Sequence, residues 1–137
     1  MSEDEMVLKG IKCFQKQSHY KWIKQEVPFL SRCIDVVLLD ESDKLISVEF
    51  KIANWKHAIV QASDHKLGSD YAYICLPKRT ITPALTDTLT NTGVGLMLFD
   101  DEAQRIENVI SPNKNRNITA FRSMLLNNAN HISSVDF

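Results

Sequence analysis

Apolar residues recur along the first half of the chain with the periods of one helix and three strands. Val7, Ile11 and Phe14 follow a helical period, which predicts a helix over residues 4–17. Alternating or continuous apolar residues then predict three strands, over 20–27, 32–40 and 44–52. Because only short polar links separate these strands, we expect them to pair antiparallel.

The second half of the chain predicts strands that alternate with helices. Asn54 is suited to cap a helix that begins at Trp55, and Gly68 is suited to end it. The remaining elements are expected, in order, as a strand at 70–77, a helix at 82–93, a strand at 94–100, an edge strand at 105–110 and a helix at 118–128. This alternation favours parallel crossovers, so we predict an α/β fold with a mixed sheet of five or six strands flanked by helices. A length of 137 residues favours a single domain, residues 1–137.

Two charged residues interrupt the otherwise apolar strand expected at 44–52. Glu49 and Lys51 are two positions apart, so their side chains leave the strand on the same side. A chance occurrence in a chain with 24% charged residues, or a salt bridge from Lys51 to a nearby carboxylate, would also explain the pair. Its position inside an apolar strand, directly before a helix, favours a functional role.

The apolar pattern of this strand and the preceding one predicts a third charged residue nearby. The apolar sides of the two strands match in one register, which pairs Val36 with Val48 and Ile34 with Phe50. The same register places Asp35 opposite Glu49, with Cβ atoms about 4.5–5.5 Å apart. We therefore expect the two carboxylates and Lys51 to converge on the face away from the apolar set.

Two carboxylates and a lysine in one place are suited to a particular chemistry. Like charges in a half-buried position repel, and a bound divalent cation removes this repulsion. Carboxylates, a backbone carbonyl and water are suitable ligands for Mg²⁺, and a nearby lysine stabilises charge that develops on a phosphodiester. Gln61 lies on the flank of the next expected helix, where it either faces solvent or reaches the end of the strand.

Asp35, the triplet Glu49-Phe50-Lys51 and Gln61 in the segment AIVQA together resemble the motif of the PD-(D/E)XK nuclease superfamily, which includes restriction endonucleases and Holliday-junction resolvases. The resemblance covers residues 20–77. It implies a restriction-endonuclease-like core with the order helix, three antiparallel strands, helix, strand. Ile34 stands where the name of the motif has a proline, which many members lack.

The resemblance implies a role for each of these residues. Asp35 and Glu49 would hold Mg²⁺ (or Mn²⁺) together with the backbone carbonyl of Phe50. Lys51 would position the attacking water or stabilise the pentavalent state, and Gln61 would orient Lys51 or the water. The implied reaction is the hydrolysis of phosphodiester bonds of DNA, including structured or junction DNA. Many members carry a further acid, and the candidates here are Glu3, Glu5 and Glu26.

A non-catalytic role on the same fold is the alternative function. The chain would then be a nucleic-acid-binding or partner-binding module, as a subunit of a DNA-processing assembly. A net charge of -1 favours this alternative, because neutralisation of phosphates supplies much of the affinity for DNA. The complete set of two acids, a lysine and a glutamine favours the metal-dependent nuclease.

The C-terminal part of the chain predicts two kinds of interface. Its basic residues, which have no acid among them from 108 to 135, are Lys114, Arg116 and Arg122. We predict that they lie near bound DNA, the alternative being a solvated face. The final helix has an apolar stripe of Phe121, Met124 and Leu125. This stripe predicts either a homodimer held by the C-terminal region or packing of the helix on its own sheet.

The termini and the cysteines set the expected environment. The start, MSEDEM, is acidic, unlike a secretory signal, and no apolar run reaches the length of a membrane span. A cytoplasmic protein with no membrane partner is expected. The three cysteines are odd in number and lack a C-x-x-C spacing, which argues against a zinc site or a disulfide framework.

Overall fold

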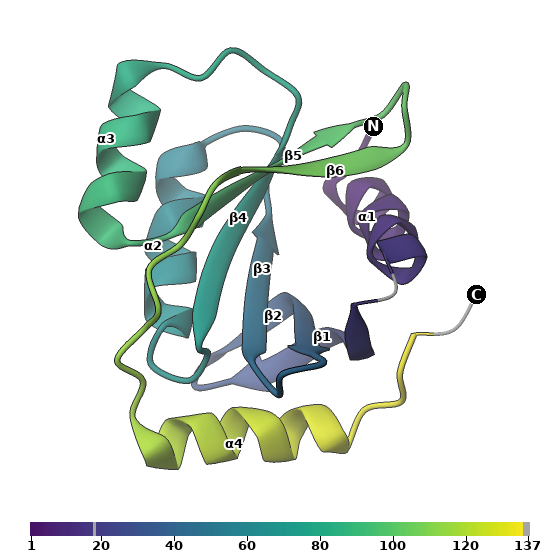
Figure 1. The fold of residues 1–137 in the computed structure, drawn as a ribbon, viewed down its shortest axis with the longest axis vertical. Coiled ribbons are helices and arrows are strands. Elements are labelled where there is room, and N and C mark those ends of the chain that lie inside the picture. Colours follow the sequence, from purple (N-terminus) through teal and green to yellow (C-terminus); the bar gives the residue numbers. More distant parts are fainter. Residues whose placement is uncertain (18, 136–137) are drawn as a thin grey trace.

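The computed structural model describes residues 1–17 and 19–135, which form a mixed sheet flanked by helices (Figure 1). The helices are α1 (Glu3–Gln17), α2 (Trp55–His65), α3 (Pro83–Thr92) and α4 (Thr119–Asn130). The strands are β1 (Tyr20–Phe29), β2 (Arg32–Asp40), β3 (Leu45–Phe50), β4 (Tyr71–Pro77), β5 (Gly95–Asp100) and β6 (Arg105–Ile110). No helix in this described part of the chain is long and apolar enough to cross a membrane.

The six strands lie in one sheet in sequence order, β1-β2-β3-β4-β5-β6. β1, β2 and β3 pair antiparallel through short turns, β3, β4 and β5 pair parallel across α2 and α3, and β6 returns antiparallel. The predicted α/β fold with a mixed sheet is therefore confirmed. The strand expected to end at 27 continues through Pro28, because β1 is an edge strand, where proline is tolerated.

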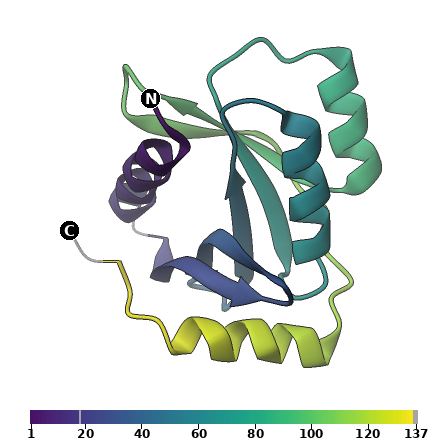
Figure 2. The same ribbon diagram turned by 180° about the vertical axis from the view of Figure 1, so that it is seen from behind.

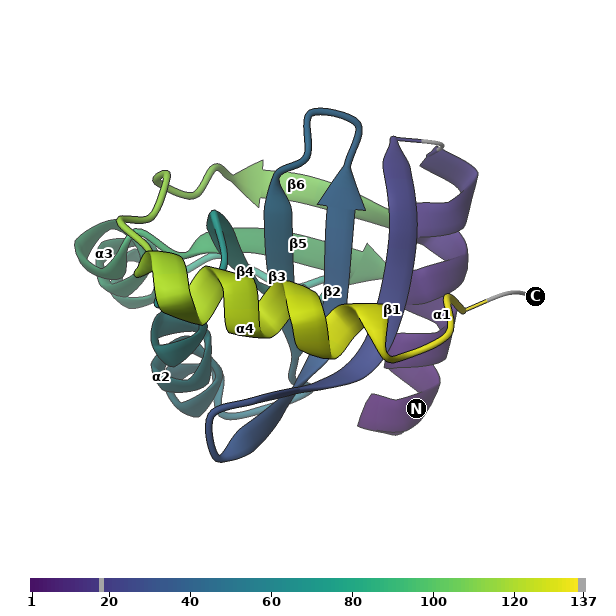
Figure 3. The ribbon, with the colours of Figure 1, turned by 90° about the horizontal axis from the view of Figure 1, so that it is seen from below.

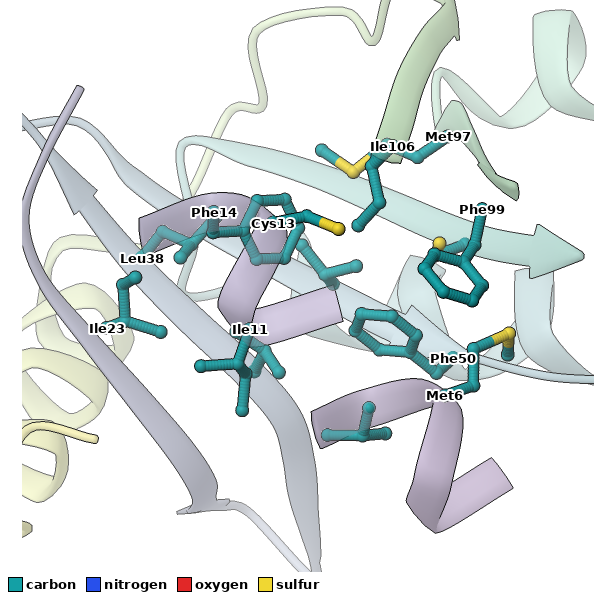
Figure 4. Close-up of a cluster of buried hydrophobic side chains, with 14 of the residues drawn as sticks. Met6, Ile11, Cys13, Phe14, Ile23, Leu38, Phe50, Met97, Phe99 and Ile106 are labelled. Carbon is teal, nitrogen blue, oxygen red and sulfur yellow. The ribbon is translucent and has the colours of Figure 1, made fainter. Parts of the chain in front are cut away.

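Helices cover both faces of the sheet, and α1 lies alone on one of them (Figures 1 and 2). Under α1 a large apolar cluster joins the helix to all six strands. Phe50, Phe99 and Ile106 belong to this cluster and pack with the buried residues of α1 (Figure 4). Gly10 of α1 lies so close to the Phe50 ring that a Cβ there would be 2.7 Å from it. The end of β3 is therefore held directly against α1.

The opposite face is shared by α2 and α3 over β4 and β5, and by α4 over β1, β2 and β3 (Figure 3). Leu125 and Ala129 of α4 are fully buried, whereas Met124 is 40% exposed. Of the two alternatives for this helix, packing on its own sheet is the one observed. A homodimer remains a prediction, but the buried side of α4 is not available to hold it.

One expected face assignment is wrong. Ile34 does not share a face with Val36, because Ile34 packs with Val27 under α4 and Val36 packs under α1. The change occurs at Glu26, whose φ of 53° is left-handed and interrupts the alternation of β1. The β1–β2 ladder passes from the pair Gln25–Val36 to the pair Val27–Ile34 with no bridge between Glu26 and Asp35 in the described strands.

Candidate active site

Asp35 and Glu49 meet where β2 and β3 begin to separate. The described β2–β3 ladder has the predicted register and reaches the pair Val36–Val48. Beyond this pair, side chains bridge the two strands: the Asp35 N–H donates to Glu49 Oε1 at 3.3 Å, and the Phe50 N–H donates to Asp35 Oδ2 at 2.8 Å. The two carboxyl groups therefore lie side by side at the end of the ladder.

The two carboxyl groups are strongly coupled. Glu49 is only 4% exposed. Burial and, next, the charge of Asp35 raise the pKa of Glu49 to about 8. Burial also raises the pKa of Asp35, although the Phe50 N–H opposes this shift. Since burial raises the pKa of both groups and their charges repel, the pair retains one proton that the two carboxyl groups share.

Lys51 lies just past the end of β3, and its ammonium group approaches α1. Its Nζ is 3.8 Å from Glu3 Oε1, and the two side chains are 25% and 43% exposed. The charge of Lys51 lowers the pKa of both Asp35 and Glu49, whereas the charge of Glu3 raises that of Asp35. Four charged groups from α1, β2 and the end of β3 are thus close together.

The acid that α1 contributes is therefore Glu3. Glu5 and Glu26, the other two candidates, are exposed. Among the described residues, neither of their side chains forms a hydrogen bond or an ion pair with Asp35, Glu49 or Lys51. Glu3 has the first position of the helix, which an α-helical period alone does not distinguish from its neighbours.

Helix α2 begins as predicted and contributes two residues to this region. The side chain of its N-cap, Asn54, accepts a hydrogen bond from the His57 N–H at 3.4 Å. Gln61 is half-buried, and in the described part of the chain its side chain forms no hydrogen bond with the carboxylates or Lys51. One turn later, His65 is 2% exposed, and its Nδ1 lies 3.6 Å from Glu49 Oε1.

His65 is the residue of the site that the sequence did not reveal. Burial and, next, the charge of Arg32 lower the pKa of His65 to about 4, so the imidazole is neutral. Its signal was its position four residues after Gln61, which puts both on one side of α2. Beside it is a small cavity of about 80 Å³, lined by Phe29, Leu30, Ser31, Arg32, Asp64, His65 and Leu67.

The three predicted DNA-contacting residues fall into two environments. Lys114 and Arg116 are exposed and line a groove of about 440 Å³, whose other residues are Ser63, Lys66, Leu67, Asn113 and Asn115. Arg122 instead forms an ion pair with Asp70, with 3.0 Å between Nη2 and Oδ2. The guanidinium of Arg122 is therefore used inside the chain.

The oxygen ligands that this region offers a divalent metal ion are few. Among the described residues, no group of three or more histidine, cysteine, aspartate or glutamate side chains could hold a metal. A buried and a half-buried carboxyl group that share a proton are nevertheless suited to a hard cation, which would replace that proton. The pair fits a metal that takes its other ligands from backbone oxygen and water.

Comparisons with known proteins support the fold. No family model matches the sequence, and no curated protein matches it. The structure is similar to SPO1766, a protein of unknown function from Silicibacter pomeroyi, with 16% identity and a TM-score of 0.68 over 96% of this chain and 86% of that one.

Two further solved structures bear on the nuclease resemblance. A repair endonuclease from Pyrococcus abyssi has 19% identity and a TM-score of 0.59, over 73% of this chain and 47% of that one. EndoMS in the EndoMS-dsDNA2 complex has 17% identity and a TM-score of 0.52, over 72% of this chain and 44% of that one. This chain thus spans less than half of either protein. At such identities the likeness establishes a nuclease-like fold.

Proposed function

We propose that this chain is a metal-dependent nuclease of the PD-(D/E)XK type that hydrolyses phosphodiester bonds of DNA. The observation that carries the proposal is the contact of the buried carboxyl group of Glu49 with the half-buried one of Asp35, beside the ammonium group of Lys51. An endonuclease-like fold under this arrangement supports it further.

Asp35, Glu49 and the backbone carbonyl of Phe50 would hold Mg²⁺ or Mn²⁺. When bound, the metal supplies Lewis acidity, which polarises the phosphate and lowers the pKa of a water molecule. The protein keeps the two carboxyl groups in place through the Asp35 and Phe50 N–H groups, which limits the reorganisation needed when the ion binds.

Lys51 and Gln61 would act on the phosphodiester and the attacking water. The ammonium of Lys51 stabilises the charge that develops on the phosphate in the pentavalent state. Glu3 keeps this ammonium beside the carboxylates, since its own carboxylate is 3.8 Å away. Gln61, on the side of α2 that also carries His65, would orient Lys51 or the water.

The groove beside Lys114 and Arg116 is the proposed path of the nucleic acid. Both side chains are exposed, and the groove of about 440 Å³ that they line also contains Lys66. Positive charges in a groove attract phosphates even on a chain whose net charge is -1. One of the two endonuclease-like neighbours was solved with dsDNA, which supports DNA as the nucleic acid that binds.

The decisive experiment is cleavage of DNA in the presence and absence of Mg²⁺. We expect metal-dependent cleavage by the unmodified chain and a loss of at least 100-fold in Lys51→Ala, because charge stabilisation by one preorganised donor contributes on the order of 10²–10³. Lys9→Ala is the matched control. Lys9, on α1, also pairs with an acid, Asp101, at 3.0 Å, but it forms no ion pair with the carboxyl groups of the site in the described structure.

A non-catalytic binding module is the second candidate. The ion pair of Lys51 with Glu3 favours it, because a paired ammonium has less charge to offer a phosphate. DNA binding without cleavage in any of Mg²⁺, Mn²⁺ or Ca²⁺ would support this role over the nuclease. Cleavage retained in Lys51→Ala would contradict the assigned chemistry.

A further inference from the structure

A buried histidine next to the carboxylate pair has no hydrogen-bond partner among the described residues. His65 is 2% exposed, and neither Nδ1 nor Nε2 is hydrogen-bonded in the described structure. Leaving a buried polar group unpaired costs about 1–3 kcal/mol. The backbone at His65 is firmly held, since its carbonyl accepts hydrogen bonds from the Gly68 and Ser69 N–H groups and the Ser69 hydroxyl. The imidazole therefore stays against Glu49 although this costs stability.

We infer that His65 is a positioning residue, which donates its Nδ1–H to Glu49 Oε1 and so orients this carboxylate toward the metal ion. The inference rests on the metal site of the proposed function. Nδ1 already lies 3.6 Å from Oε1, and the two side chains are 3% and 6% exposed. A small approach of these atoms produces a hydrogen bond that water does not compete for.

The surroundings of His65 favour the tautomer with the proton on Nδ1. A neutral imidazole has one N–H donor and one bare acceptor nitrogen. Glu49 offers a carboxylate oxygen, Oε1, on the Nδ1 side. Arg32 and Ser31 line the cavity of about 80 Å³ on which His65 borders, and a guanidinium can only donate hydrogen bonds. Asp64 is the one acid among the cavity's residues, and in the described structure it forms no hydrogen bond with either ring nitrogen of His65.

The role differs from simple packing in what it requires of the side chain. A hydrogen bond to a metal-holding carboxylate fixes its orientation, and loss of such a partner typically weakens metal affinity by roughly 10–100-fold. Packing requires only volume. Leucine would fill the space of the ring without a donor, whereas asparagine is smaller but places an amide N–H near the position of Nδ1.

The test is the affinity for Mn²⁺, measured by titration calorimetry on the whole chain. We expect His65→Leu to bind Mn²⁺ roughly 10–100-fold more weakly than the unmodified chain, and His65→Asn to recover most of the loss. His57→Asn is the matched control, because His57 is exposed on the same helix, and its affinity should be unchanged. Thermal melts without metal identify any variant that fails to fold.

A second readout does not depend on any variant. In the Mg²⁺-saturated chain, the ¹⁵N chemical shifts of His65 should show the proton on Nδ1, and a proton on Nε2 would overturn the inference. Equal losses of Mn²⁺ affinity in His65→Leu and His65→Asn would also overturn it, as would unchanged affinity in His65→Leu. A chain that binds no Mn²⁺ at all overturns the proposed function as well, so the two failures are distinguishable.

Discussion

At each end of β3, a carboxylate from another part of the chain accepts a backbone N–H of the strand. The two carboxylates differ in their other partners. At the start of the strand, Asp70 Oδ2 accepts the Leu45 N–H at 2.7 Å; at its end, Asp35 Oδ2 accepts the Phe50 N–H at 2.8 Å. Asp70 is completed by a guanidinium, from Arg122. Asp35 is completed by a second acid, Glu49.

These partners shift the pKa values of the carboxyl groups at the two ends of β3 in opposite directions. Burial alone would raise the pKa of Asp70, but the hydrogen bonds from Arg122 and the Leu45 N–H hold it below its usual range. Asn117 adds a further donor to Asp70 at 2.8 Å. At the other end, burial and a like charge raise the pKa of Glu49 to about 8. A satisfied acid of this kind stabilises the fold, whereas an unsatisfied pair leaves capacity for a ligand.

The largest expected effect comes from removing the cation that pairs with Asp70, at the start of β3. Arg122→Ala leaves Asp70, which is 5% exposed, without its cation, and we expect the free energy of unfolding to fall by about 3 kcal/mol. Urea unfolding measures it. Arg105→Ala is the control, since its ion pair with Glu107 is exposed on both sides and should contribute less than about 1 kcal/mol. Equal effects of the two changes would remove the contrast.

The Asp35–Glu49 pair at the end of β3 should make the free energy of unfolding depend on pH. Folded Glu49 retains a proton up to a pKa of about 8 that the unfolded chain loses near 4.5, so it makes stability fall as pH rises between these values. His65, whose pKa is lowered from 6.5 to about 4, has the opposite effect below pH 6.5. The two effects offset each other at lower pH.

A net fall of about 1 kcal/mol in the free energy of unfolding is therefore expected between pH 6.5 and pH 8 without metal. Urea unfolding across this range measures it. Glu49→Gln should flatten the curve, because the amide does not titrate. A fall of the same size in that variant would assign it to other groups.

A bound metal ion should stabilise the fold only through the Asp35–Glu49 pair at the end of β3. With Mn²⁺ or Mg²⁺ at ten times its Kd, the free energy of unfolding of the unmodified chain should rise by about 1.4 kcal/mol. Asp35→Asn should lose this gain in thermal melts while being neutral or more stable without metal, because one of two repelling carboxylates is gone. Asp101→Asn, at an exposed acid, should keep the gain. A metal shift in Asp35→Asn as large as in the unmodified chain contradicts the site.

The smallest expected effect concerns Arg116, an exposed residue of the groove that also contains Lys114. Arg116→Ala should reduce the slope of log K for DNA against log salt concentration by about 0.9, as expected for one lost phosphate contact. Fluorescence anisotropy at several salt concentrations measures it. Lys21→Ala should leave the slope unchanged, since Lys21 is paired with Asp43 at 2.6 Å. An unaffected slope in Arg116→Ala would make the basic groove a solvated face.

The sequence predicted the parts of the site that depend on apolar periodicity. The β2–β3 register followed from which residues must be buried, and it was enough to bring Asp35 to Glu49. The start of α2 followed from its N-cap, Asn54, whereas the helix ends at His65, before the Gly68 that was expected to end it. These features are local, and a shift by one residue would expose a whole apolar side.

The features that the sequence did not predict depend on contacts between distant segments. Arg122 and Arg116 are indistinguishable as letters, and only the position of Asp70, 52 residues away, separates their roles. Glu26 adopts a left-handed conformation that is uncommon for a residue other than glycine, so the change of face near Ile34 had no signal. His65 is buried by the tertiary packing of α2 on β3, which periodicity alone does not measure.

The strand order leaves two outer edges, and the chain protects them by different means. Along β1, the segment after α4 covers the edge: the Val135 N–H donates to the Ile23 carbonyl at 3.0 Å, and Lys24 Nζ donates to the Ile132 carbonyl. β6 has no further strand beside it in the described structure and relies on the charges of Arg105 and Glu107. Charged edges resist sheet-to-sheet association. Removal of residues 132–135 would therefore uncover the β1 edge and make self-association a hazard.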